Sequence, residues 1–137
     1  MRKIIIMSFS LLISITAVAM GKDDFTDPSK SIAVTPASRN IVLKIQSNPT
    51  TGYSWFLVYY DRDLLTPVNR TYVAPTSNLV GASGYELWNF KVSNKAFVVP
   101  QVTHITLQQI RPWAASDQDH GVTFTVIIHK NDQNQKR

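Results

Sequence analysis

Histidine and acidic side chains are the groups in this sequence that could support catalysis or bind a metal ion. His104, His120 and His129 do not fall into a ligand spacing such as H-x-x-x-H with a third donor. Asp117, Asp119 and His120 form the densest polar cluster, but their spacing matches no calcium loop. We interpret this cluster as a polar loop, with a metal or acid/base site as the alternative. The sequence has no cysteine and no G-x-S-x-G motif, so we expect no enzyme, no metal and no cofactor.

A second kind of chemistry, the recognition of a partner, is suggested by Asn48-Pro49-Thr50-Thr51-Gly52-Tyr53. This hexapeptide lies between two apolar, β-prone runs and predicts the loop that joins two strands. Pro49 fixes its own φ and favours an extended Asn48, while Gly52 allows a positive φ. The two threonines between these stiff points can offer hydroxyls and backbone amides to a partner. A hairpin connection with no further role is the alternative.

Two more loops have unusual compositions. Gly81-Ala82-Ser83-Gly84 has almost no side chains, so it can run flat against another backbone. Arg111-Pro112-Trp113 is stiffened by proline, and arginine and tryptophan are enriched in binding hot spots. Trp113 could instead cap the core. If all three loops lie at one end of a sandwich, they form one binding surface.

Short strands are the elements expected to position these loops. No stretch after the N-terminal apolar run has a sustained helical period. Seven runs predict strands: Ile32–Val34, Ile41–Ile45, Tyr53–Tyr60, Arg70–Ala74, Glu86–Val92, Thr103–Ile110 and Val122–His129. Their regular spacing, with proline and glycine at the turns, predicts an all-β, immunoglobulin-like antiparallel β-sandwich of seven to eight strands.

Alternation within these runs assigns side chains to the core. The expected core faces are Ile41, Leu43 and Ile45; Trp88, Phe90 and Val92; Thr103, Ile105 and Leu107; and Val122, Phe124, Val126 and Ile128. Tyr53–Tyr60 is apolar on both faces and is predicted to be a central, covered strand, with Tyr53, Trp55, Leu57 and Tyr59 on one side. Asp61–Asn69 is predicted to be a connection with a helical turn that ends before Pro67, and Arg70–Ala74 an edge strand.

Length and composition predict one exported domain. Residues 1–19 of the 137 combine Arg2-Lys3, an apolar run and Ala17-Val18-Ala19, the pattern of a secretory signal peptide; a membrane helix is the alternative. Met20–Arg137 would be the mature domain, periplasmic or secreted, with residues 20–31 a loose leader.

The formal net charge of +5 falls to +3 in the mature domain, which lacks Arg2 and Lys3. The basic residues form no stripe with aromatics, so we expect no nucleic-acid binding, and no membrane association after cleavage.

In order and spacing, the three loop motifs resemble those of the chagasin family of cysteine peptidase inhibitors, over about Asn40 to Lys130. The resemblance implies an immunoglobulin-like fold and reversible, tight-binding inhibition of papain-like peptidases, whether the organism's own or a host's, by a monomer. It places Thr50, Thr51 and Gly52 at the centre of the catalytic cleft, with Asn48 and Pro49 holding the loop's shape. Arg111, Pro112 and Trp113 would flank the cleft on one side and Gly81–Gly84 on the other.

One position departs from the family pattern. The glycine-rich loop of the family usually reads G-x-G-G, and Ser83 stands in place of the middle glycine. If that position needs a positive φ, serine costs about 1 kcal/mol, and affinity or target range would change.

Two other classes of function remain as alternatives. One is an exported carbohydrate-binding or adhesion module that stacks sugars on exposed Trp55, Trp88 and Trp113, and the other is a structural subunit of an exported assembly.

Overall fold

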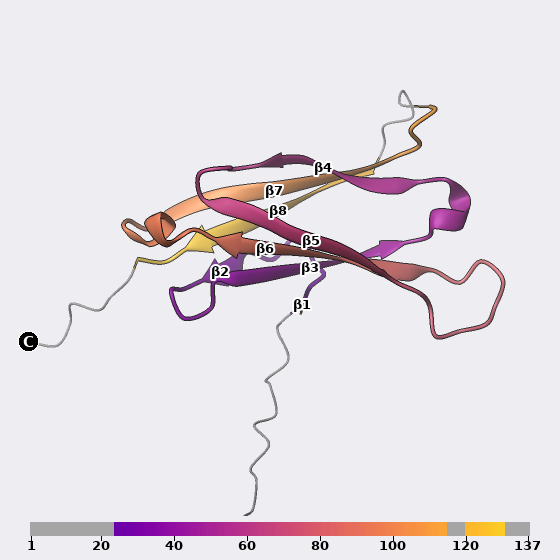
Figure 1. Cartoon of the computed structure of the whole chain (residues 1–137), viewed down its shortest axis with the longest axis horizontal. Coiled ribbons are helices and arrows are strands. Elements are labelled where there is room, and N and C mark those ends of the chain that lie inside the picture. The colour runs from indigo at the N-terminus through magenta and orange to yellow at the C-terminus, as the bar shows by residue number, and fades with distance from the viewer. Residues whose placement is uncertain (1–23, 115–119, 131–137) are drawn as a thin grey trace, which may run out of the picture.

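The structure, a computed structural model, describes residues 24–114 and 120–130. They form two four-stranded sheets packed face to face (Figure 1). One sheet has the order β1-β3-β6-β5, formed by Asp24–Phe25, Asn40–Ser47, Gly84–Val92 and Leu65–Val73. The other has the order β2-β8-β7-β4, formed by Ile32–Val34, His120–Ile128, Gln101–Ile110 and Ser54–Tyr60. The predicted β-sandwich is confirmed.

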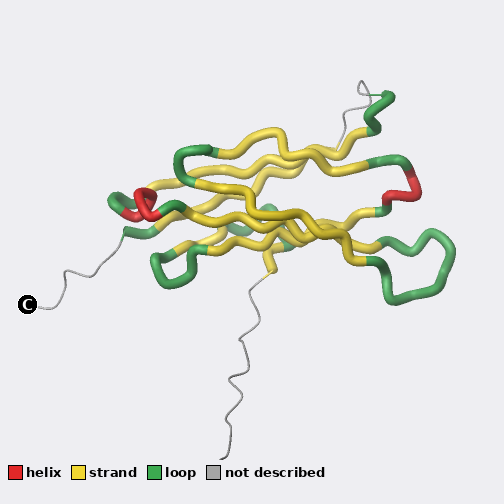
Figure 2. The backbone as a smooth tube through the Cα atoms, viewed as in Figure 1, coloured by secondary structure: helices red, strands yellow, loops and turns green. Residues whose placement is uncertain are grey.

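Most neighbouring strands pair antiparallel, but the two short N-terminal strands do not. β1 pairs parallel with β3, and β2 pairs parallel with β8. Two short 3₁₀ helices complete the described part of the chain: η1 (Pro49–Thr51) and η2 (Asn94–Phe97). They lie at opposite ends of the sandwich (Figure 2).

The core lies between the sheets and is built from the predicted alternating faces. Strands β3, β6, β7 and β8 bury the side chains assigned to them from sequence: Ile41, Leu43, Ile45, Trp88, Phe90, Val92, Thr103, Ile105, Leu107, Phe124, Val126 and Ile128, with Val122 packed against them half-buried. Burial of this apolar surface is the main favourable term in folding of a chain without disulfides.

Strand β4 differs from the prediction of a central, covered strand. It lies at the edge of its sheet and pairs with β7 alone. The register shifts between Leu57 and Tyr59, and this bulge interrupts the alternation, as bulges do. Trp55, Leu57 and Tyr60 pack on the core, whereas Tyr59 is exposed. An apolar strand is therefore tolerated at an edge because the bulge reassigns its faces.

Strand β5 also begins earlier than predicted. Leu65–Val73 is one strand, so the expected helical turn and connection over Asp61–Asn69 are wrong beyond Leu64. Its edge position is confirmed. Pro67 is accommodated because it lies beside a register shift between Pro67 and Asn69 on an edge strand, where a missing N–H costs least.

The segment expected to be a loose leader, residues 20–31, lies partly outside the described residues, which begin at residue 24. Asp24 and Phe25 pair with Val42 and Leu43 of β3, and Phe25 packs against the core. The predicted signal peptide, residues 1–19, lies outside the described part of the chain. Within residues 24–114 and 120–130, no helix is long and apolar enough to cross a membrane.

Candidate functional site

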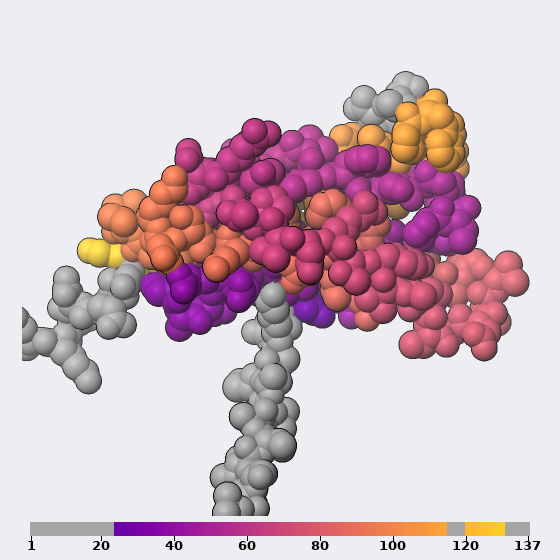
Figure 3. Space-filling view, viewed as in Figure 1, coloured from indigo at the N-terminus to yellow at the C-terminus, as the bar shows by residue number. Residues whose placement is uncertain are grey.

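Strand register brings the three predicted loops to one end of the sandwich. Ser47, the last residue of β3, pairs with Gly84, the first of β6, so the Asn48 and Gly81 loops leave the sheet side by side. In the other sheet, Ser54 pairs with Ile110, which places Tyr53 next to Arg111. The three loops project from the right-hand end in Figures 1 and 3.

The Asn48 loop is a compact turn organised by the asparagine. The amide of Thr51 donates to the carbonyl of Asn48 at 3.2 Å, and Gly52 N donates to Pro49 O at 3.0 Å. The hydroxyl of Thr50 donates to Asn48 Oδ1 at 2.6 Å, and that of Thr51 to Asn48 O at 2.7 Å. Gly52 closes the turn with φ of 81°. The loop therefore has a defined, non-extended shape, with Pro49, Thr50 and Thr51 exposed at its tip.

The Arg111 loop braces this turn from one side. The Arg111 guanidinium lies 4.3 Å from the centroid of the Tyr53 ring, a favourable cation–π distance. The Trp113 indole lies so close to Gly52 that a Cβ there would be 2.8 Å from two ring carbons. Trp113 nevertheless remains 74 % exposed, so it does not cap the core. The indole presents an apolar face beside the threonine turn.

The glycine-rich loop contacts the Asn48 loop from the other side. Asn48 Nδ2 donates to the carbonyl of Gly81 at 3.3 Å, and Gly81 has a φ of 82°. No described residue other than glycine has a positive φ, so Ser83 carries none of the strain considered for it. Gly84 is needed for a different reason: a Cβ there would lie 2.2 Å from the carbonyl oxygen of Val73 on the neighbouring strand.

Two exposed apolar residues that the sequence interpretation did not single out precede this loop. Leu79 and Val80 are 77 % and 105 % exposed, directly before Gly81. The sequence could have indicated them, because two adjacent apolar residues inside a polar loop are unusual on a surface.

A hollow of about 620 Å³ joins the three loops. Residues from all three line it, together with strand ends beneath them: Ile45, Gln46, Asn48, Thr51, Tyr53, Trp55, Ser83, Gln109, Arg111 and His120. Arg111 Nε is buried and has no hydrogen-bond partner among the described residues. The site is thus a ridge of loops around a partly polar hollow. Asp117 and Asp119, predicted to cluster with His120, lie outside the described residues.

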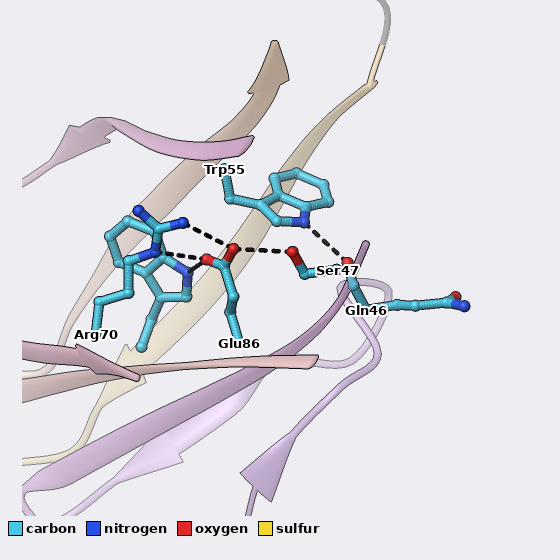
Figure 4. A network of polar contacts seen from close by, with 6 residues as sticks. Gln46, Ser47, Trp55, Arg70 and Glu86 are labelled. Carbon is cyan, nitrogen blue, oxygen red and sulfur yellow. Dashed lines mark hydrogen bonds and ion pairs between the residues drawn. The ribbon is translucent and has the colours of Figure 1, made fainter. Parts of the chain in front are cut away.

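A buried polar network supports the base of the ridge (Figure 4). The Glu86 carboxylate is 1 % exposed and accepts from Arg70 Nε at 2.7 Å and Arg70 Nη2 at 2.8 Å. It also accepts from Ser47 Oγ at 2.9 Å and Trp88 Nε1 at 3.0 Å. These bonds fix Ser47, the residue before Asn48, to strands β5 and β6. Such bonds to a buried charged group are among the strong ones.

The same base is tied to the second sheet. Trp55 Nε1 donates to the carbonyl of Gln46 at 2.9 Å, which joins β4 to β3 across the two sides of the Asn48 loop (Figure 4). The sequence interpretation did not single out Glu86, which lies on the same face of β6 as Trp88 and Phe90. Its partner Arg70 is 16 residues earlier in the chain, and no local pattern connects them.

The structure contradicts the sugar-stacking alternative. Trp55 and Trp88 are 6 % and 9 % exposed, so a sugar-stacking surface of three tryptophans does not exist. His104 and His129 are exposed on the surface. Among the described residues, no three metal-ligating side chains come together.

The described residues form an immunoglobulin-like β-sandwich with three loops gathered at one end. The chain belongs to the chagasin family: the family model described as "Chagasin family peptidase inhibitor I42" matches residues 35–128. This confirms the predicted family. No curated protein matches the chain significantly.

Solved structures share the fold. The cysteine protease inhibitor EhICP2 from Entamoeba histolytica aligns with a TM-score of 0.59 and 20 % identity, over 77 % of this chain and 92 % of that one. PbICP-C, solved in complex with falcipain-2, aligns with a TM-score of 0.52 and 11 % identity, over 80 % of this chain and 91 % of that one.

Proposed function

We propose that this protein is a reversible, tight-binding inhibitor of papain-like cysteine peptidases, and that its three-loop end occupies the peptidase cleft. Family membership supports the class of partner. The observation that carries the proposal is the packing of all three loops into one ridge: Asn48 bonds to Gly81 O, and Trp113 lies against Gly52.

We propose a separate role for each loop of this ridge. Thr50 and Thr51, exposed at the tip, enter the cleft beside the catalytic residues. Trp113 packs on an apolar surface of the peptidase on one side, where a large, rigid side chain gives contact area at low entropic cost. The segment around Gly81 follows the substrate groove on the other side, where its small side chains allow close backbone approach.

The shape of the Asn48 loop accounts for binding without cleavage. A peptide bond is cut when the substrate extends across the catalytic residues in a geometry close to attack. Pro49–Thr51 instead forms a 3₁₀ turn held by backbone and hydroxyl bonds to Asn48. Because this shape exists before binding, little further ordering is needed when the complex forms.

The chain acts as a monomer exported through its N-terminal signal sequence. Of the four edge strands, β1 and β2 are short. The longer two, β4 and β5, each carry a register shift, and bulges of this kind hinder edge-to-edge association. Size-exclusion chromatography coupled to light scattering tests the monomer, and mass spectrometry of the exported protein tests cleavage near Ala19.

Titration of papain with the mature protein Met20–Arg137 tests the function. We expect stoichiometric loss of papain activity on a fluorogenic peptide, with trypsin unaffected. Trp113→Ala removes an exposed side chain and should weaken inhibition by about 30-fold or more, as loss of a hot spot does. Full papain activity in the presence of micromolar protein, repeated with cathepsin-type enzymes, would overturn the proposal.

A further inference from the structure

Among the described residues, basic side chains without an acidic or aromatic partner are concentrated at the end of the sandwich opposite the loops. The described residues include nine lysines and arginines. Six of them pair with a carboxylate or lie over an aromatic ring: Lys30 with Asp27, Arg70 with Glu86, Lys95 with Asp63, Lys44 with Tyr85, Arg62 with Tyr60, and Arg111 with Tyr53. Of the three that do neither, Arg39 and Lys91 line the same pocket.

This pocket has the lining of an anion site. Its volume is about 330 Å³, and it is formed by Arg39, Thr66, Lys91, Val92, Ser93 and Asn94. No carboxylate is among these lining residues, whereas hydroxyl donors come from Thr66 and Ser93. Backbone pairing fixes the walls, since Lys91 is opposite Asn40 on one side and Thr66 on the other.

Arg39 is held in place by a side-chain partner. Its Nη1 donates to Asn94 Oδ1, so the amide group of Asn94 remains a donor. No other described side chain bonds to this guanidinium, so its remaining N–H groups are available to a ligand. The chain at this point is also anchored, because Val92 N donates to Arg39 O at 2.8 Å and Ser93 N to Leu64 O at 2.8 Å.

We propose that this pocket binds a phosphomonoester group carried on a small molecule or a lipid headgroup. A guanidinium and an ammonium together balance a dianion. The phosphate oxygens can accept from the guanidinium, the ammonium, the two hydroxyls and the Asn94 amide. The volume is at the lower end of the range for small-molecule sites, which leaves room for a small organic group besides the phosphate.

The position of the pocket lets both ends of the molecule bind at once. Lys91 and Ser47 lie at opposite ends of the paired strands β3 and β6, since Asn40 pairs with Lys91 and Ser47 with Gly84. Seven residues of strand separate these two pairs, about 23 Å. A ligand bound at Arg39 therefore leaves the loop ridge free, and the inference does not depend on the proposed inhibition.

Glycerol 3-phosphate is the probe, with glycerol as the uncharged comparison, in low-salt buffer at neutral pH. We expect the amide signals of Ser93 and Asn94 to shift in NMR titration, and those of Thr51 and Gly52 to stay. Arg39→Gln and Lys91→Gln should each weaken binding about tenfold, the loss of one charged hydrogen bond. Lys130→Gln is the matched control, because Lys130 has no acidic or aromatic partner among the described residues either but does not line the pocket.

Vesicles distinguish the two sources of the phosphate. Co-sedimentation with phosphatidylcholine vesicles that contain phosphatidic acid, lost in Lys91→Gln, would support a lipid headgroup. Binding of glycerol 3-phosphate without vesicle binding would support a soluble ligand. The proposal is overturned if wild-type protein does not bind glycerol 3-phosphate, or if Lys130→Gln weakens binding as much as Lys91→Gln does.

Discussion

Different kinds of polar contact stabilise the two ends of the sandwich. At the loop end, the Glu86 carboxylate is almost fully buried and accepts four hydrogen bonds from three side chains. At the opposite end, Lys95 bonds Asp63 at 3.0 Å, but these side chains are 61 % and 87 % exposed. One end is fixed by an interior network, and the other has an ion pair in solvent.

This difference shows which end of the fold depends more strongly on exact side-chain partners. Exposed ion pairs contribute little because water screens them and two long side chains must be ordered. A buried carboxylate must be matched by donors or the fold is strongly destabilised. The buried Glu86 network lies next to Asn48, because Glu86 accepts from Ser47. The same interactions that stabilise the fold here therefore also hold the Asn48 loop in place.

Of the substitutions considered, Glu86→Gln should have the largest effect on stability, and it tests the difference between the two ends directly. The new amide places a donor against the guanidinium of Arg70, while at most one oxygen remains for Ser47 and Trp88. We expect a loss of about 3 kcal/mol in the free energy of unfolding, at the lower end of the range for a broken buried pair because Arg70 is itself 42 % exposed. Urea denaturation measures it.

The matched variant at the other end is Asp63→Asn, which removes the ion pair with Lys95. Its expected cost is about 0.5 kcal/mol or less. Equal losses in the two variants would contradict the distinction between the two ends.

Gly52→Ala should give the next largest effect, on inhibition rather than stability. A methyl group there meets the Trp113 ring at 2.8 Å and forces an L-residue to a φ of 81°, so both the turn and the indole must move. Strain of this kind and the displaced ring together should raise the papain inhibition constant by about 30-fold.

Gly81→Ala separates the two causes. Gly81 has a φ of 82°, but a methyl group on its Cα would meet no atom within 4 Å, so this variant tests strain alone. We expect a rise of about tenfold or less. If both variants weaken inhibition equally, the contact between Trp113 and Gly52 does not shape the loop.

Ser83→Gly should have the smallest effect. Ser83 has no positive φ to relieve, and glycine adds freedom to the unfolded chain. Stability should fall by about 0.5 kcal/mol, and papain inhibition should change by less than about twofold. A large gain in affinity would instead mean that the serine side chain obstructs the peptidase, as the family pattern G-x-G-G suggests.

The fold was largely predictable because the core faces follow local alternation. Ile41, Leu43 and Ile45 are buried as their spacing requires, and so are Trp88, Phe90 and Val92. Turn chemistry also located the Asn48 loop correctly, since the constraints of Pro49 and Gly52 act within a few residues.

The errors arise where one strand depends on another. Alternation could not reveal the bulge at Leu57 to Tyr59, because register is set by pairing with β7. Pro67 suggested the end of a helical turn, yet its place on an edge strand makes it acceptable. The same holds for the site: the partners of Glu86 include side chains from two other strands, so its role appears only when the strands are assembled.

The exposed indole of Trp113 also gives the protein its own optical reporter. The other two tryptophans are buried, at 6 % and 9 % exposure, and both donate their indole N–H to protein acceptors. We therefore expect the emission of a dry environment from these two rings and that of a hydrated ring from Trp113, which is 74 % exposed. A partner that covers the loop ridge removes water from this one ring, so a blue shift in fluorescence can follow complex formation without any attached label.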